Sequence, residues 1–252
     1  MKSAADIRAG VVKVCRDLDR REYVGGRDGN VSALLPDGNV VVTPAGMRKG
    51  DVALEHLLVV DRKGKALGGR GRASTELGMH LRIYELRADV RAVVHAHPPV
   101  ATGFAAAGVA LKECVLPEVI VGLGRVPIAP YATPGTPEVS RALDDLVAKH
   151  DAILLANHGA VTVGEDVDAA YQRLETVEQA ARILLVARLL GGAQPLSASE
   201  VAELVSSRAR YGVREGLAAC DVAPCASAAL TPEEEALAAR IAARVREQLS
   251  SR

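Results

Sequence analysis

The feature that most constrains the fold is a set of short apolar runs that lie between longer stretches of helical character. The runs Arg91–Ala96, Asp151–Asn157 and Ala160–Val163 have the length and composition of buried strands. Ile7–Tyr23 carries apolar residues at helical spacing, and Val167–Leu190 is a long helical segment. Because strands and helices do not alternate in a regular rhythm, the sequence predicts a layered α/β domain with a mixed or largely antiparallel sheet.

The other segments complete this pattern. Further strands are predicted at Val31–Leu35, Val40–Thr43, Leu57–Val60 and Val126–Tyr131, and further helices at Ser74–Arg87, around Val100–Ala107, and at Pro137–His150 and Ser199–Gly216. Ser74 is a natural N-cap for the helix that it opens. Residues 218–230 are rich in Ala, Cys and Pro and are typical of a linker, and residues 231–252 have the apolar stripe of an amphipathic helix. We therefore expect a domain over residues 1–217, a linker over 218–230 and a C-terminal helix over 231–252.

Composition excludes several classes of protein. The chain has 31 basic and 31 acidic residues, and only 2% of its residues are aromatic. This balance argues against a nucleic-acid-binding chain and a polybasic membrane-surface protein. The longest uncharged apolar stretches, such as Pro98–Leu111, are shorter than the roughly 18 residues that a membrane-spanning helix needs. Cys15, Cys114, Cys220 and Cys225 are scattered, and we interpret them as reduced thiols in a cytoplasmic protein.

Three histidines carry the main chemical signal. His95 and His97 close a predicted strand, and side chains two apart in a strand point to the same face. His158 follows a second apolar strand, directly before Gly159. Three imidazoles with one exchangeable position are the usual catalytic zinc arrangement, so we predict a metal site. The alternative is a set of strand-end histidines that bind only the backbone.

The other histidines carry less information. His56 and His150 lie among charged residues, and we expect both to be solvated. His80 is one helical turn beyond Glu76. It either supports the metal site or packs on a helix face.

A second cluster, Ser74-Thr75-Glu76, is typical of an anion site. Two hydroxyls and free backbone N–H groups at a helix start favour a phosphate, and the helix dipole reinforces them. The alternative is a plain helix cap, and Glu76 in the first turn is then explained by the dipole. Two glycine-containing loops, Gly29-Asn30-Val31-Ser32 and Thr43-Pro44-Ala45-Gly46-Met47, could complete the pocket, because Gly permits close approach and Asn offers a donor.

Taken in order, these elements resemble the class II aldolase/adducin family over roughly residues 5–217. The resemblance rests on Gly29-Asn30-Val31-Ser32, Thr43-Pro44-Ala45-Gly46, Ser74-Thr75-Glu76, His95-Ala96-His97, Ala129-Pro130-Tyr131-Ala132-Thr133-Pro134-Gly135-Thr136 and His158-Gly159. The ordered set is specific, although no single motif is. It implies a single three-layer domain whose mixed, largely antiparallel central sheet is flanked by helices. It also implies a homotetramer with sites at subunit interfaces.

The resemblance further implies a set of roles. Zn²⁺, or a similar divalent ion, would be held by His95, His97 and His158, with Glu76 as a fourth ligand and proton shuttle. The substrate phosphate would be held by Gly29, Asn30, Ala45, Gly46, Ser74 and Thr75. Tyr211 would be offered to a neighbouring subunit's site. The implied reaction is reversible cleavage of a ketose 1-phosphate, such as L-fuculose 1-phosphate or a related deoxy-pentulose or hexulose phosphate. Its products would be dihydroxyacetone phosphate and a short aldehyde such as L-lactaldehyde.

Two positions depart from the family's fuculose-cleaving members. Ala45 stands where those enzymes have a hydroxyl beside the phosphate, and Leu116 stands where they have a tyrosine that reaches the aldehyde. Epimerase, dehydratase and decarboxylase relatives share the metal, and an adducin-like interaction module without catalysis is the alternative of another class. The linker and helix beyond residue 217 resemble encapsulation peptides of bacterial microcompartment enzymes. This likeness implies contact with a microcompartment shell, whereas a helix that docks on the oligomer is the alternative.

Overall fold

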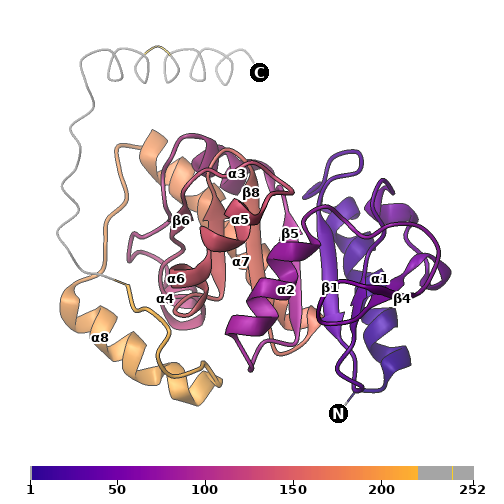
Figure 1. Cartoon of the computed structure of the whole chain (residues 1–252). Helices are drawn as coiled ribbons and strands as arrows, with labels where there is room; N and C mark the ends of the chain where they lie inside the picture. Colours follow the sequence, from indigo (N-terminus) through magenta and orange to yellow (C-terminus); the bar gives the residue numbers. More distant parts are fainter. Residues whose placement is uncertain (1, 221–239, 241–252) are drawn as a thin grey trace.

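The chain folds around one eight-stranded sheet in the order β4-β3-β2-β1-β5-β8-β7-β6 (Figure 1). The computed structural model describes residues 2–220 and residue 240. The strands are β1 (Asn30–Leu34), β2 (Val40–Val42), β3 (Leu58–Val60), β4 (Ala66–Gly68), β5 (Ala92–Ala96), β6 (Ile128–Ala129), β7 (Ala152–Leu155) and β8 (Gly159–Gly164). Every neighbouring pair is antiparallel except β6 and β7, which are parallel. The predicted mixed, largely antiparallel sheet is confirmed.

Helices cover both faces of the sheet. On one face lie α1 (Ala4–Arg20), α3 (Pro99–Ala106) and α7 (Val167–Leu189), and on the other lie α2 (Leu77–Leu86), α5 (Pro137–Arg141) and α6 (Asp144–Val147). Strand β5 serves both cores: Val94 packs on the α7 side, whereas Val93 packs on the α2 side. Successive strand side chains point to opposite faces, so a fully apolar strand belongs between two helix layers. This arrangement is the expected three-layer domain.

The last helices lie at one edge. Helices α4 (Pro117–Gly122) and α8 (Ala198–Ser207) and the 3-10 helix η3 (Arg208–Tyr211) form a small group, with α8 at lower left in Figure 1. The predicted helix Ser199–Gly216 therefore ends earlier than expected, at Ser207. No signal in the sequence had indicated α4 or strand β4. Two further 3-10 turns, η1 (Lys49–Asp51) and η2 (Leu54–His56), follow β2.

Helix starts follow local capping rules, with one exception. Ser3 caps α1 in a capping box with Asp6, and the Asp166 carboxylate caps α7. The prediction that Ser74 caps the helix around Glu76 is wrong, because α2 begins at Leu77. The Ser74 hydroxyl instead accepts hydrogen bonds from the Asn30 amide and the Glu76 N–H, which hold residues 74–76 as a turn before the helix.

Three further expectations need correction. The predicted helix Pro137–His150 is two short helices, α5 and α6. His150 is buried rather than solvated, and its Nδ1 lies 3.2 Å from the Arg125 carbonyl. Cys114 and Cys220 are not reduced thiols but form a disulfide, with their Cα atoms 5.8 Å apart. Their separation of 106 residues explains why spacing along the chain gave no sign of the pairing.

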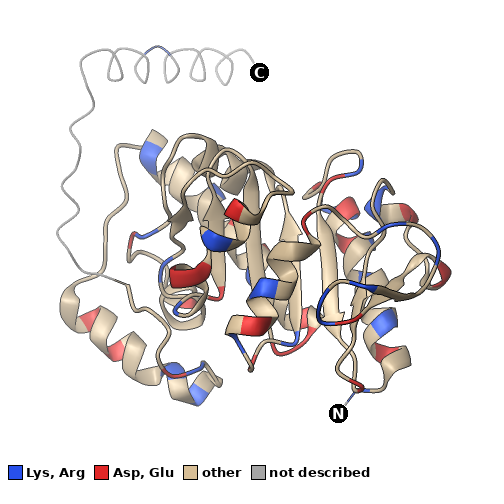
Figure 2. Cartoon of the chain, in the orientation of Figure 1, with Lys and Arg blue, Asp and Glu red and all other residues tan. Residues whose placement is uncertain are grey.

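Charges are distributed without segregation. In the view of Figure 2, basic and acidic residues are interspersed over the helices and loops. Within residues 2–220, none of the helices has the length and apolar character of a membrane span. The predicted linker beyond residue 220 and the predicted C-terminal helix, apart from residue 240, lie outside the described residues.

Candidate metal centre

Three imidazoles converge at the end of β5. His95 is the fourth residue of that strand, His97 follows its end, and His158 lies in the turn between β7 and β8. The antiparallel pairing of Ala96 with Ala160 brings this turn beside β5. One nitrogen from each ring lies within 4.8 Å of the others, and the Nε2 atoms of His95 and His97 are 3.2 Å apart. His97 and His158 are 61 positions apart in the chain, and they share one centre because β5 pairs with β8.

The histidines are in the form that a metal needs. His95 is fully buried, and its Nδ1 lies 2.9 Å from the Ala160 carbonyl. If Nδ1 carries the proton for that bond, Nε2 presents a lone pair toward the centre. Burial lowers the pKa of His95, of His158 and, to about 4, of His97. The rings are therefore neutral near pH 7.

Glu76 supplies a carboxylate to the same centre. Its Oε1 lies 3.3 Å from His158 Nε2, and its Oε2 lies 3.4 Å from His95 Nε2. The Asn30 amide donates to Oε2 at 2.8 Å. Burial opposes ionisation of Glu76, but the neighbouring imidazoles and the Asn30 amide outweigh it, so the pKa is lowered. The carboxylate is held ionised between two of the rings.

This donor set fits a divalent transition metal. Three imidazole nitrogens and one carboxylate oxygen are ligands that Zn²⁺ takes in tetrahedral sites. Glu76 Oε1 is buried and has no hydrogen-bond partner, although a buried carboxylate oxygen normally has one. A metal ion between the carboxylate and the rings would satisfy this oxygen.

The predicted anion loops meet beside the centre. Asn30 pairs with His95 across β1 and β5, and its amide also donates to Ser74 at 3.2 Å. Pro44 forms a β-bridge with Ala73, and the N–H of Ala45 donates to the Arg72 carbonyl. These contacts bring the loops at residues 29–30, 44–46 and 73–75 into one wall.

Gly29 is required in this wall. Its φ is +71°, in the left-handed region that favours glycine. A Cβ at this position would lie 2.8 Å from the His95 carbonyl oxygen. Any larger residue would therefore push the loop away from the metal ligands.

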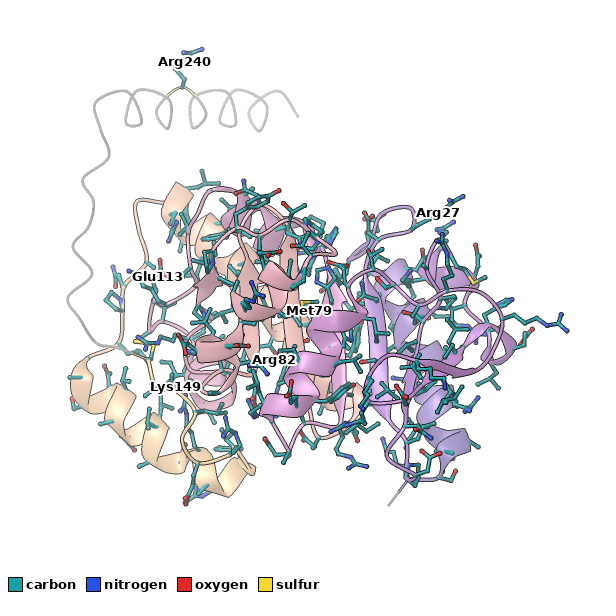
Figure 3. The ribbon with its side chains drawn as sticks, viewed as in Figure 1. Arg27, Met79, Arg82, Glu113, Lys149 and Arg240 are labelled. Carbon is teal, nitrogen blue, oxygen red and sulfur yellow. A yellow bond between two sulfur atoms is a disulfide. The ribbon has the colours of Figure 1, made fainter. Side chains whose placement is uncertain are left out.

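An open cavity borders Glu76, although none of the three histidines lines it. It has a volume of about 620 Å³ and is lined by Thr75, Glu76, Arg82 and Thr136, among others. Arg82 lies on α2 (Figure 3) and forms two hydrogen bonds with Asp144. The cavity gives a small polar ligand access to Glu76.

Comparison with known proteins identifies the family of this fold. The chain matches the family described as Class II Aldolase and Adducin N-terminal domain over residues 9–185. The chain belongs to the class II aldolase and adducin family.

Individual members of this family differ in reaction. The chain is 33% identical to the 3-oxo-tetronate 4-phosphate decarboxylase of Escherichia coli (strain K12), over 81% of this chain and 98% of that protein. It is 35% identical to the L-fuculose phosphate aldolase of Methanococcus maripaludis, over 68% of this chain and 92% of that protein. The structure of L-fuculose-1-phosphate aldolase from Thermus thermophilus superposes with a TM-score of 0.67 and 32% identity, covering 77% of this chain and 100% of that chain.

Most of the residues predicted from the sequence meet in this class II aldolase fold. The three histidines and Glu76 share one centre, and Asn30 and Ser74 adjoin it. Tyr211 does not reach the histidines of its own chain. It is 67% exposed and lines a separate cavity between α4, α7 and α8.

Sequence reasoning missed two residues near the site. The Asp28 carboxylate lies 3.7 Å from His97 Nδ1, on the side of the ring away from the centre. Lys49 is buried behind the anion loops. Asp28 precedes the Gly29-Asn30 motif, which was a usable signal, but nothing local distinguished Lys49 from a surface lysine.

His80 is placed by the structure on the helix face that packs on β1. It is buried, and its Nδ1 lies 2.7 Å from the Ser32 hydroxyl, which also bonds Tyr84. His80 is thus packed on a helix face, as one of its two interpretations expects, and its support of the metal site stays a prediction. His56 is half-buried and accepts a hydrogen bond from the N–H of Ala53.

Proposed function

We propose that this protein is a metal-dependent carbon–carbon lyase that acts on a phosphorylated ketone and releases dihydroxyacetone phosphate. The observation that carries the proposal is the position of Glu76, whose carboxylate oxygens lie 3.3 and 3.4 Å from His158 and His95. The same side chain is hydrogen-bonded to Asn30 in the anion wall. A base is thus placed between a metal site and a phosphate site, as cleavage next to a carbonyl requires.

The histidine trio would hold the ion, with zinc as the first candidate. When bound, the ion supplies Lewis-acid polarisation of the substrate carbonyl. The phosphate is held by Asn30, Ser74 and Thr75 together with the backbone of Gly29 and Gly46. Ala45 lies in the same loop but offers no hydroxyl, and its N–H is already bonded to the Arg72 carbonyl, so it contributes no donor.

Glu76 moves the protons. Its lowered pKa keeps it ionised near pH 7, so it is ready to accept a proton. When the C3–C4 bond of a ketose 1-phosphate breaks, the C4 hydroxyl loses a proton and the bonding pair stays on C3. Glu76 returns a proton to C3, which completes dihydroxyacetone phosphate, and the other fragment leaves as an aldehyde. L-Fuculose 1-phosphate, which yields L-lactaldehyde, is the first substrate to assay.

Decarboxylation is a second candidate, and Leu116 favours it. Leu116 packs partly buried against the α7-side core and has no hydroxyl to offer an aldehyde oxygen. A carboxylate that leaves as CO₂ has no hydroxyl proton to give up, so this reaction does not need a polar group at the position of Leu116. Loss of C1 from a 3-oxo-tetronate 4-phosphate leaves the same three-carbon unit, and the similarity to decarboxylases of that name supports this candidate.

A product assay separates these reactions. Zinc-loaded protein is incubated with dihydroxyacetone phosphate and L-lactaldehyde, and separately with 3-oxo-tetronate 4-phosphate while CO₂ is measured. A new ketose phosphate supports the aldolase, and CO₂ supports the decarboxylase. If neither product forms, a pentulose phosphate is tested next. Its epimerisation at C4 would point to an epimerase, and its loss of water would point to a dehydratase.

Glu76→Gln tests the role of the base. We expect about a 10²–10⁴-fold loss of turnover with zinc retained, because the isosteric amide cannot accept a proton. Glu55→Gln, an exposed carboxylate in η2, is the matched control and should behave like the wild type. Near-normal turnover of Glu76→Gln with metal bound contradicts the mechanism. Absence of stoichiometric divalent metal after dialysis would favour an adducin-like interaction module.

We also propose how the sites assemble. The catalytic unit is residues 1–217, the protein is a cytoplasmic homotetramer, and Tyr211 is directed at a neighbouring subunit's site. The high exposure of Tyr211, at 67%, supports this placement. Light scattering gives the oligomeric state. Mixed oligomers of Tyr211→Phe and Glu76→Gln chains would recover activity only if each site uses both subunits.

A further inference from the structure

The most unusual group near the anion wall is the Lys49 side chain. It is 1% exposed, whereas lysines are almost never fully buried unless paired. Within residues 2–220 its ammonium forms no ion pair. It donates instead to two backbone carbonyls, those of Met47 at 2.8 Å and Arg27 at 3.3 Å. Burial lowers the pKa of Lys49 and outweighs the attraction of the Asp28 carboxylate, which lies beyond ion-pair distance. A buried cation without an ion-pair partner is costly, so its retention calls for an explanation.

The two carbonyls belong to different loops of the anion wall. Met47 directly follows Gly46, and Arg27 precedes Gly29 and Asn30 by two and three residues. Arg27 lies at the outer rim of the fold (Figure 3), but its backbone carbonyl points inward and accepts the hydrogen bond from Lys49. One ammonium therefore joins two loops that are 20 residues apart in the chain and that both adjoin the phosphate site.

The segment that carries Lys49 is itself fixed. Arg48 forms two hydrogen bonds with Asp19 of α1, and a Cβ on Gly50 would lie 2.5 Å from the same carboxylate. Helix α1 thus anchors η1 on both sides of Lys49. Because its backbone is held in this way, Lys49 can keep the two loops at a fixed spacing.

We propose that Lys49 is a positioning residue that sets the spacing of the two phosphate loops and supplies the buried positive charge that a dianionic phosphate balances. The proposal rests on the proposed function, because it assumes that these loops bind phosphate. Positive charge in a low-dielectric wall acts on an anion without touching it. The net charge of the chain is zero, so such local placement matters more here than overall charge.

Inorganic phosphate binding to the zinc-loaded full chain tests the proposal. Lys49→Met removes the charge and both donors but keeps an unbranched apolar stem, and Lys63→Met, in an exposed turn, is the matched control. We expect Lys49→Met to weaken phosphate binding about 10–100-fold. Its zinc affinity, measured by chelator competition, and the rate at which it joins unphosphorylated dihydroxyacetone to L-lactaldehyde should stay unchanged. A purely structural lysine would change all three together.

The arms of this experiment separate the two proposals. If wild-type protein and Asn30→Ala both fail to bind phosphate, the phosphate site of the proposed function is wrong. If the wild type binds phosphate and Asn30→Ala does not, but Lys49→Met binds like wild type, only the Lys49 proposal is overturned. Should Lys49→Met fail to fold, Lys49→Gln keeps N–H donors without the charge. A folded Lys49→Gln with wild-type phosphate affinity would equally refute the proposal.

Discussion

Gly159→Ala should disable the metal centre through one methyl group. Gly159 opens β8 directly after His158, and a Cβ there would lie 2.5 Å from Cδ2 of His97 and 2.6 Å from the Ala96 carbonyl oxygen. Its φ lies outside the left-handed region, so the effect is purely steric. The carbonyl belongs to β5, which is paired with β8 and cannot recede. The His97 ring must therefore give way by close to an ångström.

The substitution should affect folding stability and zinc affinity to different degrees. Overpacking of this kind costs about 1–3 kcal/mol of folding stability. Metal–ligand distances, in contrast, hold within about 0.2 Å, so a ring displaced this far no longer binds. Removing a group that only hydrogen-bonds to a metal ligand already weakens metal binding about 10–100-fold. For Gly159→Ala, which moves the ligand itself, we expect at least about a 100-fold loss of zinc affinity.

Chelator competition monitored with a zinc indicator measures this affinity, and urea unfolding of the metal-free protein measures stability. Gly103→Ala is the matched control, because Gly103 lies within α3 and a Cβ there meets nothing within 4 Å. It should keep zinc and gain up to about 1 kcal/mol of helix stability. Wild-type zinc affinity in a folded Gly159→Ala would refute the claim that His97 occupies the space beside Gly159.

Three further predictions follow from the same structure. First, replacing Cys114 and Cys220 by Ala should lower the free energy of unfolding by about 2–5 kcal/mol, since the disulfide closes a loop of 106 residues; urea titrations with and without reductant measure this, and a wild-type chain insensitive to reductant contradicts it. Second, burial lowers the pKa of His97 to about 4 and of His80 to about 3, so the unfolded chain takes up protons first as the pH falls below about 6.5. Stability of the metal-free protein should therefore be intact above pH 6.5 and drop by about 2–4 kcal/mol by pH 5, and a flat profile over that range in urea unfolding would exclude neutral buried histidines. Third, a chain ending at residue 220 should fold and bind zinc like the full chain, because both helix–sheet cores lie within residues 2–220. Loss of its tetramer in light scattering would assign the removed tail to oligomer docking, loss of shell association alone would assign it to targeting, and loss of zinc binding would disprove the expectation.

The sequence anticipated the parts of the fold that depend on neighbouring residues. Strand β5 was visible because its apolar run is continuous, and α1 was visible because its apolar residues recur at helical spacing. The exceptions have long-range causes. The helix at Glu76 starts late because Ser74 is bonded to Asn30, a residue 44 positions away. His150 is buried although its sequence neighbours are charged, because tertiary packing covers it.

Local patterns along the chain were enough to identify residues that could carry chemistry. His95 and His97 lie two apart in a strand, and that spacing alone places them on one face. Which distant groups join them depends on the packing of the whole fold. Glu76 reaches His158 across 82 residues, and Lys49 bridges two loops that share no local pattern. Local patterns report backbone preferences over a few residues, whereas such contacts depend on how strands pair and helices pack.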